Sequence, residues 1–297
     1  MSKLFLIGNG ESRKNFDLNI LKDHGKVYGC NGLYRDYTPD ALISVDPGIM
    51  HETYDKGYAL DNTCYYRGWT SIPAMMYDDM VNTHILDMKG KFGEEPKLFE
   101  SSKPEGTQEF VIHGTSALLH DQLLKGEKRE YKGLGSNVLF VSWLHPNDKV
   151  KPISEYMKES YDVGYSAGPT ALNIGCHVEK PEQVFMIGCD IFSNTNKFNN
   201  MYKDTLHYES KTTGAVPTEN WLEQYKSNFM IFSDIEFIKV NEFPLGTDSV
   251  NKEIEEWSDA ININYITAIF RSNLRGRNSI HKFYSKRNYI TTTRFYK

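Results

Sequence analysis

The chain has 297 residues, of which 39% are hydrophobic, 25% charged and 13% aromatic, a composition that excludes a disordered chain and predicts a globular protein. Its four cysteines lie far apart and form no CxxC pair, which excludes a zinc ribbon and gives no sign of a disulfide framework. The net charge of −5 is unevenly distributed, because Asp259 is the last acidic residue and eight lysines or arginines follow it.

Length and patterning predict one large domain over residues 1–259, followed by a basic, aromatic appendage over residues 260–297. No apolar run reaches the length of about 20 residues that crosses a bilayer. The amino-terminal MSK leads directly into a strand pattern, without the architecture of a signal peptide. We therefore expect a cytoplasmic protein.

The first predicted elements alternate between buried strands and polar turns. LFLIG at 4–8 is a short apolar run stopped by a glycine-rich turn, and a helix capped by Ser12 should follow it. KVYGC at 26–30 and ALISVD at 41–46 are the next two strands, each ended by turn residues. This order predicts an α/β fold with a doubly wound, mostly parallel, Rossmann-like sheet.

The pattern weakens after the third strand and returns near residue 166. Residues 55–160 are predicted as helices and loops that cover the site, with one strand-like stretch at 137–143. Pro169 favours the first turn of a helix to about residue 177, and a strand over 183–188 follows. The remaining predicted elements are a helix over 217–229 and a strand over 236–241.

The turn after the first strand contains Gly8, Asn9 and Gly10, with Ser12 close behind. Small residues here let backbone N–H groups approach a phosphate at a helix amino end. The motif lacks the third glycine of the dinucleotide fingerprint, so an ordinary strand-to-helix turn is the alternative.

Other candidate residues stand just past the later strands and before the later helix, where a parallel sheet forms its ligand crevice. Asn31 offers an amide to a base or sugar, or is part of a turn. Asp46 caps the next helix, holds a ribose or binds a metal. A second helix amino end, facing the same crevice, is expected at Ser166, Ala167 and Gly168.

Two residues are candidates for acid–base chemistry. Asp190 ends the strand over 183–188 and has a catalytic, a metal-binding or a structural role. His207 lies in a polar loop, where it is either a general base or a solvated side chain. HExxH, GxSxG and GxxxxGK[ST] motifs are absent, which argues against metalloproteases, serine hydrolases and P-loop kinases.

Three segments resemble the bacterial sialyltransferases of glycosyltransferase family 42, together with a related fold of pterin pyrophosphokinase-like proteins. They are LIGNGESRKNFDLNIL at 6–21, VYGCNGLY at 27–34 and SAGPTALNIGCHVEKPEQVFMIGCD at 166–190, about a fifth of the chain. The resemblance implies a nucleotide-sugar donor, with its phosphate and ribose held by Asn9, Gly10 and Ser12. It also implies donor contact at Asn31.

The sequence departs from that family at three positions. Ala167 and Gly168 match a serine–glycine pair, so the serine hydroxyl is missing there. Phe192 matches a tyrosine whose phenol contacts the leaving phosphate. No histidine occupies the position of the family's base, and His207 is the nearest one upstream. These departures imply a donor sugar other than sialic acid.

The segment 260–297 interleaves cations with aromatic residues, a composition typical of contact with nucleic acid. An anionic membrane surface, or no ligand at all, is equally compatible with it. The candidate contact residues are Arg271, Arg275, Arg277, Lys282, Lys286 and Arg287.

The sequence thus predicts a glycosyltransferase that uses a UDP- or CMP-linked sugar and acts on a hydroxyl, with a lean towards a hydroxymethylated base in DNA. No other cofactor and no metal ligand is predicted, although the need for a divalent ion stays open. The alternatives are a sialyltransferase acting on a glycan, a pterin pyrophosphokinase-like transferase and a nucleotide-binding module without turnover.

Overall fold

The structure is a computed structural model that describes residues 2–82, 97–113, 138–158, 164, 166–193, 195–241, 263–269 and 282–285. The chain forms two compact units, of which unit 1 comprises Met1–Asp40 with Glu159–Lys297 and unit 2 comprises Ala41–Lys158. This division differs from the predicted single domain, because the middle of the chain contributes a sheet with its own core.

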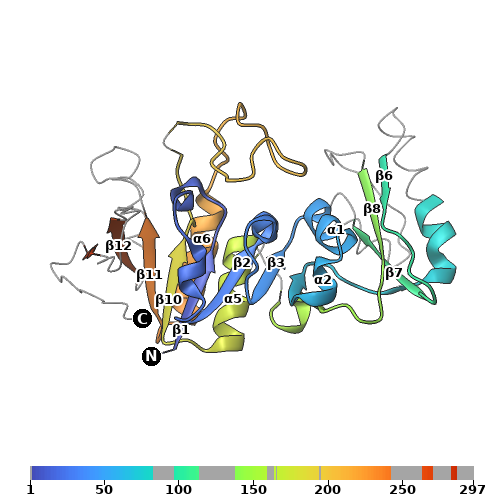
Figure 1. The fold of residues 1–297 in the computed structure, drawn as a ribbon, viewed down its shortest axis with the longest axis horizontal. Coiled ribbons are helices and arrows are strands. Elements are labelled where there is room, and N and C mark those ends of the chain that lie inside the picture. Colours follow the sequence, from blue (N-terminus) through green and yellow to red (C-terminus); the bar gives the residue numbers. More distant parts are fainter. Residues whose placement is uncertain are drawn as a thin grey trace. The chain divides into compact units, whose positions relative to one another are not determined.

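Unit 1 is built on a mostly parallel sheet with the strand order β13-β12-β11-β10-β1-β2, in which only β13 is antiparallel (Figure 1). The middle strands are continuous apolar runs, as is typical of strands covered on both faces. The bounds are β1 Lys3–Ile7, β2 Lys26–Cys30, β10 Gln183–Ile187, β11 Glu236–Asn241, β12 Ile263–Ile269 and β13 Lys282–Ser285.

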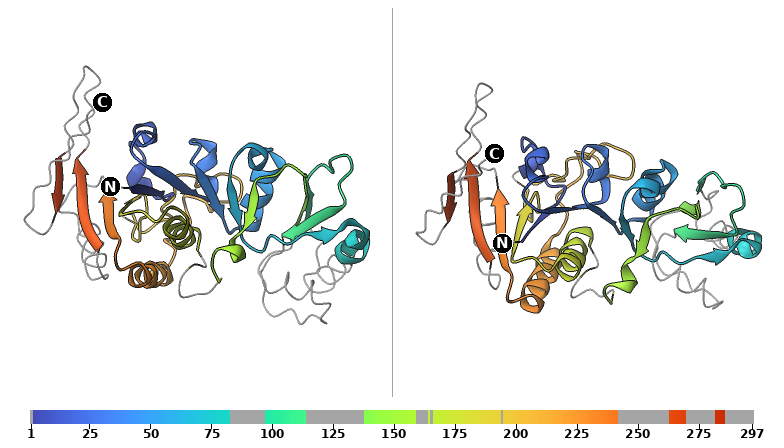
Figure 2. Two further views of the ribbon diagram at one scale, coloured as in Figure 1. Left: turned by 90° about the horizontal axis from the view of Figure 1, so that it is seen from below. Right: turned by 60° about the horizontal axis from the view of Figure 1, so that its bottom comes forward.

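Helices lie on both faces of this sheet. Figure 2 shows α5 and α6 on one face and the short helices η1, η2 and η3 on the other. Their bounds are α5 Ala167–Glu179, α6 Glu219–Ile231, η1 Glu11–Arg13, η2 Leu18–Leu21 and η3 Asn31–Arg35. The predicted fold class, a doubly wound, mostly parallel, Rossmann-like α/β sheet, is therefore confirmed.

The prediction of an α-helix after β1 is wrong. The chain after β1 forms the two short 3-10 helices η1 and η2 in place of one α-helix capped by Ser12. The Asp17 side chain accepts a hydrogen bond from the Asn19 backbone N–H, a local bond that competes with a continuous helix. Ile20 is 41% exposed, so the apolar residues here do not form one buried face.

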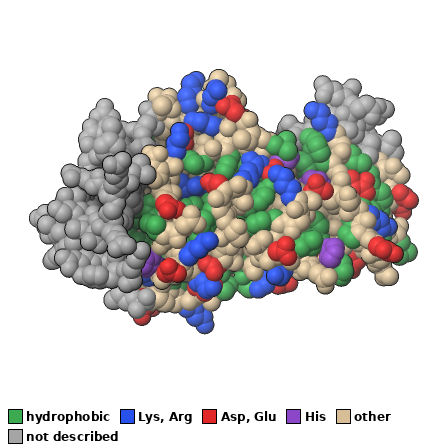
Figure 3. Space-filling view, viewed as in Figure 1, with side chains coloured by type: hydrophobic (Ala, Val, Ile, Leu, Met, Phe, Trp, Pro, Cys, Tyr) green, Lys and Arg blue, Asp and Glu red, His purple; other side chains and the backbone are tan. Residues whose placement is uncertain are grey.

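The sheet of unit 1 also includes part of the predicted appendage. β12 pairs in parallel with β11, and β13 pairs with β12, so both strands within 260–297 extend the sheet. Among the described residues, none of the helices has the length and apolar character needed to span a membrane. On the face drawn in Figure 3, acidic and basic side chains are interspersed.

Unit 2 contains a parallel group of three strands and a separate four-stranded sheet. The parallel group has the order β3-β4-β9, and the second sheet has the order β5-β7-β8-β6. The strand bounds are β3 Ala41–Ser44, β4 Cys64–Tyr66, β9 Val150–Pro152, β5 Ile72–Pro73, β7 Glu109–His113, β8 Val138–Trp143 and β6 Lys97–Glu100. The helices are α1 Pro47–Asp55, α2 Tyr58–Asp61, η4 Ala74–Met76 and η5 Ile153–Glu155.

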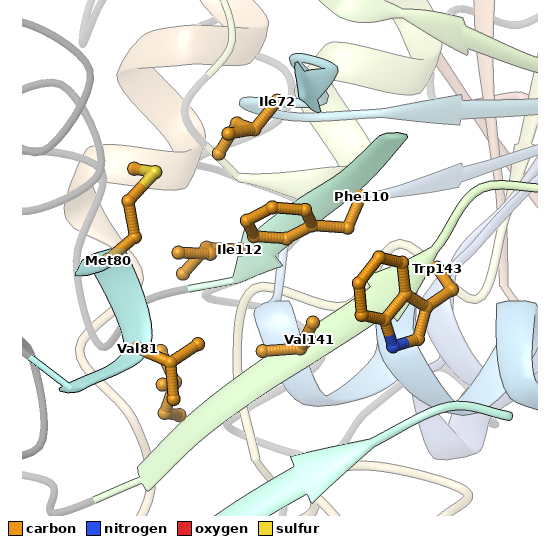
Figure 4. Close-up of a cluster of buried hydrophobic side chains, with 8 residues drawn as sticks. Ile72, Met80, Val81, Phe110, Ile112, Val141 and Trp143 are labelled. Atoms are coloured by element: carbon orange, nitrogen blue, oxygen red, sulfur yellow. The ribbon is translucent and has the colours of Figure 1, made fainter. Parts of the chain in front are cut away.

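The second sheet of unit 2 corrects the prediction of irregular cover over residues 55–160. Phe110, Ile112, Val141 and Trp143 from β7 and β8 pack against Ile72 and against Met80 and Val81 of the helical residues 77–82 (Figure 4). The strands were missed because they are short and pair with distant parts of the chain. Only β8, which is six residues long, gave a strand pattern in the sequence.

A buried serine of β8 joins a histidine of α1 to a histidine of β7. The Ser142 hydroxyl oxygen lies 3.2 Å from His51 Nδ1 and 2.8 Å from His113 Nε2. Ser142 is fully buried, and both histidines are below 10% exposure. One hydroxyl oxygen can serve both rings, because it carries one donor and two acceptor sites.

Replacing Ser142 with alanine should lower the free energy of unfolding by about 1–3 kcal/mol, because both imidazole nitrogens lose a buried partner. The urea midpoint of the variant measures this loss. The exposed Ser71 in the same unit gives the matched control Ser71→Ala, which should be close to neutral. Equal midpoints for the two variants would show that the hydroxyl bridge contributes nothing.

Candidate functional site

The candidate site of unit 1 lies where the direction of strand order reverses. From β1 the chain proceeds to β2 on one side, whereas β10 lies on the other side and is reached much later in the sequence. In open parallel sheets, ligands bind outside the carboxyl ends of the strands at such a point. The predicted residues that follow β1, β2 and β10 all stand at this edge.

The loops that follow β1 and β10 are joined directly to each other. The Gly8 N–H donates to the Ile187 carbonyl, and the Gly10 N–H donates to the Gly188 carbonyl, both at 2.8 Å. A β-carbon at Gly8 would lie 2.8 Å from the carbonyl carbon of Gly188 and 3.1 Å from the Cα of Cys189. Gly8 and Gly10 thus allow the backbone after β1 to pack closely against the backbone after β10.

The N–H groups at the start of η1 are also taken by the protein itself. The Glu11 N–H donates to Asn199 Oδ1 at 2.8 Å, and the Ser12 N–H donates to Asp190 Oδ2 at 3.0 Å. The Ser12 hydroxyl donates to the other oxygen of the same carboxylate. The Asp190 carboxylate therefore occupies the place that the sequence assigned to a donor phosphate.

Asp190 is held by further polar contacts in the interior. Lys239 Nζ lies 3.9 Å from Asp190 Oδ1, and the side chains of Asp190 and Lys239 are 1% and 0% exposed. Asn199 Nδ2 donates to Asp190 Oδ2 at 3.2 Å. Of the three predicted roles of Asp190, these contacts favour the structural one, in which its charge fixes η1 to β10 and β11.

The second predicted helix amino end is that of α5, a helix of 13 residues. Ser166 is its N-cap, yet its side chain makes no capping hydrogen bond. Pro169 has no N–H, and the Thr170 N–H donates to the Ser166 carbonyl. Within the described part of the chain, the Ala167 and Gly168 N–H groups have no acceptor, so this end retains donors for an anion.

Tyr225 of α6 lies against the start of α5. A β-carbon at Gly168 would collide with the Tyr225 hydroxyl, which explains the glycine at that position. Burial raises the pKa of Tyr225 well above its usual range, so its phenol stays neutral. Burial also raises the pKa of the neighbouring Cys189 thiol to about 11, so this cysteine is no thiolate nucleophile near neutral pH.

Asn9 connects the ends of β1 and β2. Its Nδ2 donates to the Cys30 carbonyl at 3.0 Å, and this contact fixes the orientation of the amide because a carbonyl only accepts. Asn9 Oδ1 is buried and has no hydrogen-bond donor among the described residues. An acceptor in this state is disfavoured, which suits a site that a ligand donor completes.

Residues 195–217, here named the cover segment, lie over the loops after β1 and β2. The Met201 N–H donates to the Asn9 carbonyl at 2.8 Å, and Lys203 forms an ion pair with Glu11. Arg13 Nη2 donates to the Tyr202 hydroxyl at 2.9 Å. The cover segment is therefore anchored to the same turn that carries Asn9.

The remaining predicted residues are placed as follows. Asn31 begins η3 with a positive φ of 45°, and His207, with a φ of 65°, lies on the cover segment. The Phe192 carbonyl accepts a hydrogen bond from Asn199 Nδ2. Asp46 belongs to unit 2, where it is exposed and precedes α1. The structure thus brings Asn31, His207 and Phe192 to unit 1 and leaves Asp46 outside it.

The predicted nucleic-acid contacts fall almost entirely outside the described residues. Lys282 begins strand β13, and only its backbone is described. The other five are Arg271, Arg275, Arg277, Lys286 and Arg287, which lie outside the described ranges. Within those ranges, no group of three or more His, Cys, Asp or Glu side chains is arranged to hold a metal ion.

Three residues of the site were missed in the sequence. Lys239 stands within the strand pattern EFIKVN, and a lysine in a buried strand signals a buried acidic partner. Asn199 and Tyr208 lie in a polar loop, where no local pattern marks them. The chain matches no family model, no curated protein and no solved structure.

Proposed function

We propose that unit 1 binds a nucleotide sugar at the carboxyl edge of its sheet and that the protein is a nucleotide-sugar-dependent glycosyltransferase. The observation that carries the proposal is the amino end of α5, where two backbone N–H groups stand without an acceptor among the described residues. A helix of this length favours a phosphate at that end, through its dipole and these donors.

The proposed position of the phosphate differs from the one that the sequence predicted. The N–H groups of η1 are engaged by Asn199 and Asp190, so the proposal assigns the donor phosphate to α5 alone. The Asn9 amide supports a nucleoside next to it, because its buried Oδ1 lacks a donor among the described residues. An exocyclic amino group of a base is a suitable donor for that oxygen.

The transfer step in this proposal needs a base and an acceptor. His207 is proposed as the base that removes the proton of the acceptor hydroxyl. The acceptor oxygen then bonds to the anomeric carbon as the bond from that carbon to the phosphate oxygen breaks and the nucleotide leaves. The α5 amino end stabilises the charge on the departing phosphate. The acceptor, a hydroxymethylated base in DNA, and the cytoplasmic location rest on the sequence alone.

Replacing Ser166 with aspartate should weaken nucleotide binding without destabilising the fold. An aspartate N-cap stabilises α5 by about 0.5–2 kcal/mol relative to an uncapped end. The same charge repels a phosphate a few ångströms away and should weaken binding of UDP or CMP at least tenfold, by roughly 1.4 kcal/mol or more. Ser166→Asn, which caps without a charge, is the matched control. Thermal shift and titration calorimetry measure both effects.

The enzyme activity has its own test. Slow release of UDP or CMP from the corresponding nucleotide sugar, measured without acceptor, is expected from the wild-type protein. Tight binding of the nucleotide without any release after long incubation would favour a binding module without turnover. Unchanged nucleotide affinity in Ser166→Asp would reject the phosphate site at α5.

A further inference from the structure

The cover segment is long for a connection without helices or strands. The described residues 195–217 contain only the isolated bridge between Lys197 and Gly214. Connections longer than about 12–15 residues without regular structure are usually functional loops or linkers. Two residues at its turn, Asp204 and His207, have positive φ angles of 64° and 65°, a conformation that non-glycine residues adopt rarely.

Tyr208 connects this turn to the candidate site. Its hydroxyl oxygen accepts a hydrogen bond from the Gly32 N–H at 2.8 Å and a longer one from Asn9 Nδ2 at 3.4 Å. The second donor is the amide that the proposed function assigns to the nucleoside. Tyr208 therefore lies against the Asn9 side chain, whose Oδ1 is buried in this structure.

Arg35 holds the same turn from the side of η3. Its Nη1 donates to Thr205 Oγ1 at 2.7 Å, and its Nη2 donates to the Leu206 carbonyl at 2.9 Å. Its guanidinium carbon lies 5.3 Å from the centre of the Tyr208 ring and 5.7 Å from that of Tyr202. The turn is thus fastened mainly by polar and cation–π contacts.

Two neighbouring parts of the cover segment differ in how firmly they are held. Tyr202 is 7% exposed, and its hydroxyl accepts a hydrogen bond from the buried Arg13 and donates one to the exposed Asp36. Leu206, at the tip, is 64% exposed, and the bonds made by Arg35 are solvent-exposed. Exposed hydrogen bonds with few buried apolar contacts open at low cost. The ion pair of Lys203 with Glu11 is partly exposed as well. The tip beyond Tyr202 is therefore the part that can lift.

We propose that residues 203–213 form a latch that opens to uncover Asn9 when a nucleotide binds. The Tyr208 hydroxyl makes the contacts that hold the latch closed. The closed state holds the Asn9 amide and the Gly32 N–H on the tyrosine oxygen, so that ligand binding and closure compete. This proposal rests on the proposed function for the identity of the ligand. The contacts of the closed latch involve protein atoms alone and do not depend on that identity.

The test compares Tyr208→Phe with the wild-type full chain. Loss of the hydroxyl should speed amide hydrogen exchange at Gly32 and over 203–213 by roughly three- to tenfold, the effect of one hydrogen bond. Affinity for UDP or CMP should rise by a similar factor, because closure no longer competes. Tyr77→Phe is the matched control, since Tyr77 donates to Glu100 in unit 2.

Each readout addresses a different part of the proposal. Unchanged exchange at Gly32 and 203–213 in Tyr208→Phe would overturn the latch, whatever the ligand. Faster exchange with weaker nucleotide binding would overturn the competition and make Tyr208 a ligand contact. If the wild-type protein binds neither UDP nor CMP, the proposed function fails, while the exchange rates still decide whether the latch exists.

Discussion

Replacing Asp190 with alanine is expected to lower the free energy of unfolding by about 3–5 kcal/mol, the usual cost of breaking a buried ion pair by removing one of its members. The reason is the position of Asp190 between Lys239 Nζ and the N–H and hydroxyl groups of Ser12. The variant would remove the carboxylate that faces Lys239 and free the start of η1. Urea unfolding followed by circular dichroism measures the loss.

Two further variants separate a structural Asp190 from a catalytic one. Asp190→Asn keeps an acceptor for Ser12 but removes the charge that faces Lys239. Combining it with Lys239→Met should cost less than the sum of the two single changes, because the two side chains share one interaction. Asp23→Ala, at an exposed aspartate of the same unit, is the control. A stable Asp190→Ala protein without transferase activity would instead assign Asp190 to catalysis.

Replacing Gly8 with alanine is expected to cost about 3 kcal/mol or more, at the upper end for overpacking. The added β-carbon meets the backbone of Gly188 and Cys189, which cannot rotate away as a side chain can. The loops after β1 and β10 must then separate and lose the bond from the Gly8 N–H to the Ile187 carbonyl. The urea midpoint is again the measurement.

The control for this change is Gly214→Ala in the cover segment, where an added β-carbon meets nothing within 4 Å. It should leave stability nearly unchanged. A phosphate cradle in the turn after β1 makes a different prediction for Gly8→Ala, namely normal stability with weakened nucleotide binding. That outcome would restore the function first inferred from the sequence for this turn.

The strands and helices that flank the site were largely predictable. The predicted strands at 4–8, 26–30 and 183–188 correspond within one residue to β1, β2 and β10. Their apolar runs end at turn residues, a signal that is local in the sequence. The helix over 217–229 corresponds to α6 within two residues. The helix after β1 failed, because a local bond from Asp17 competes with it.

The sequence by itself determined the parallel sheet of unit 1 and the set of residues at its carboxyl edge, because both follow from patterns within about ten consecutive residues. Only the tertiary structure decided which polar groups at this edge remain available to a ligand. Asp190 comes within hydrogen-bond distance of Ser12 across 178 positions of the chain, and Tyr208 reaches Asn9 across 199. Local patterns do not encode such contacts, so the carboxylate in the predicted phosphate position became visible only in the folded chain.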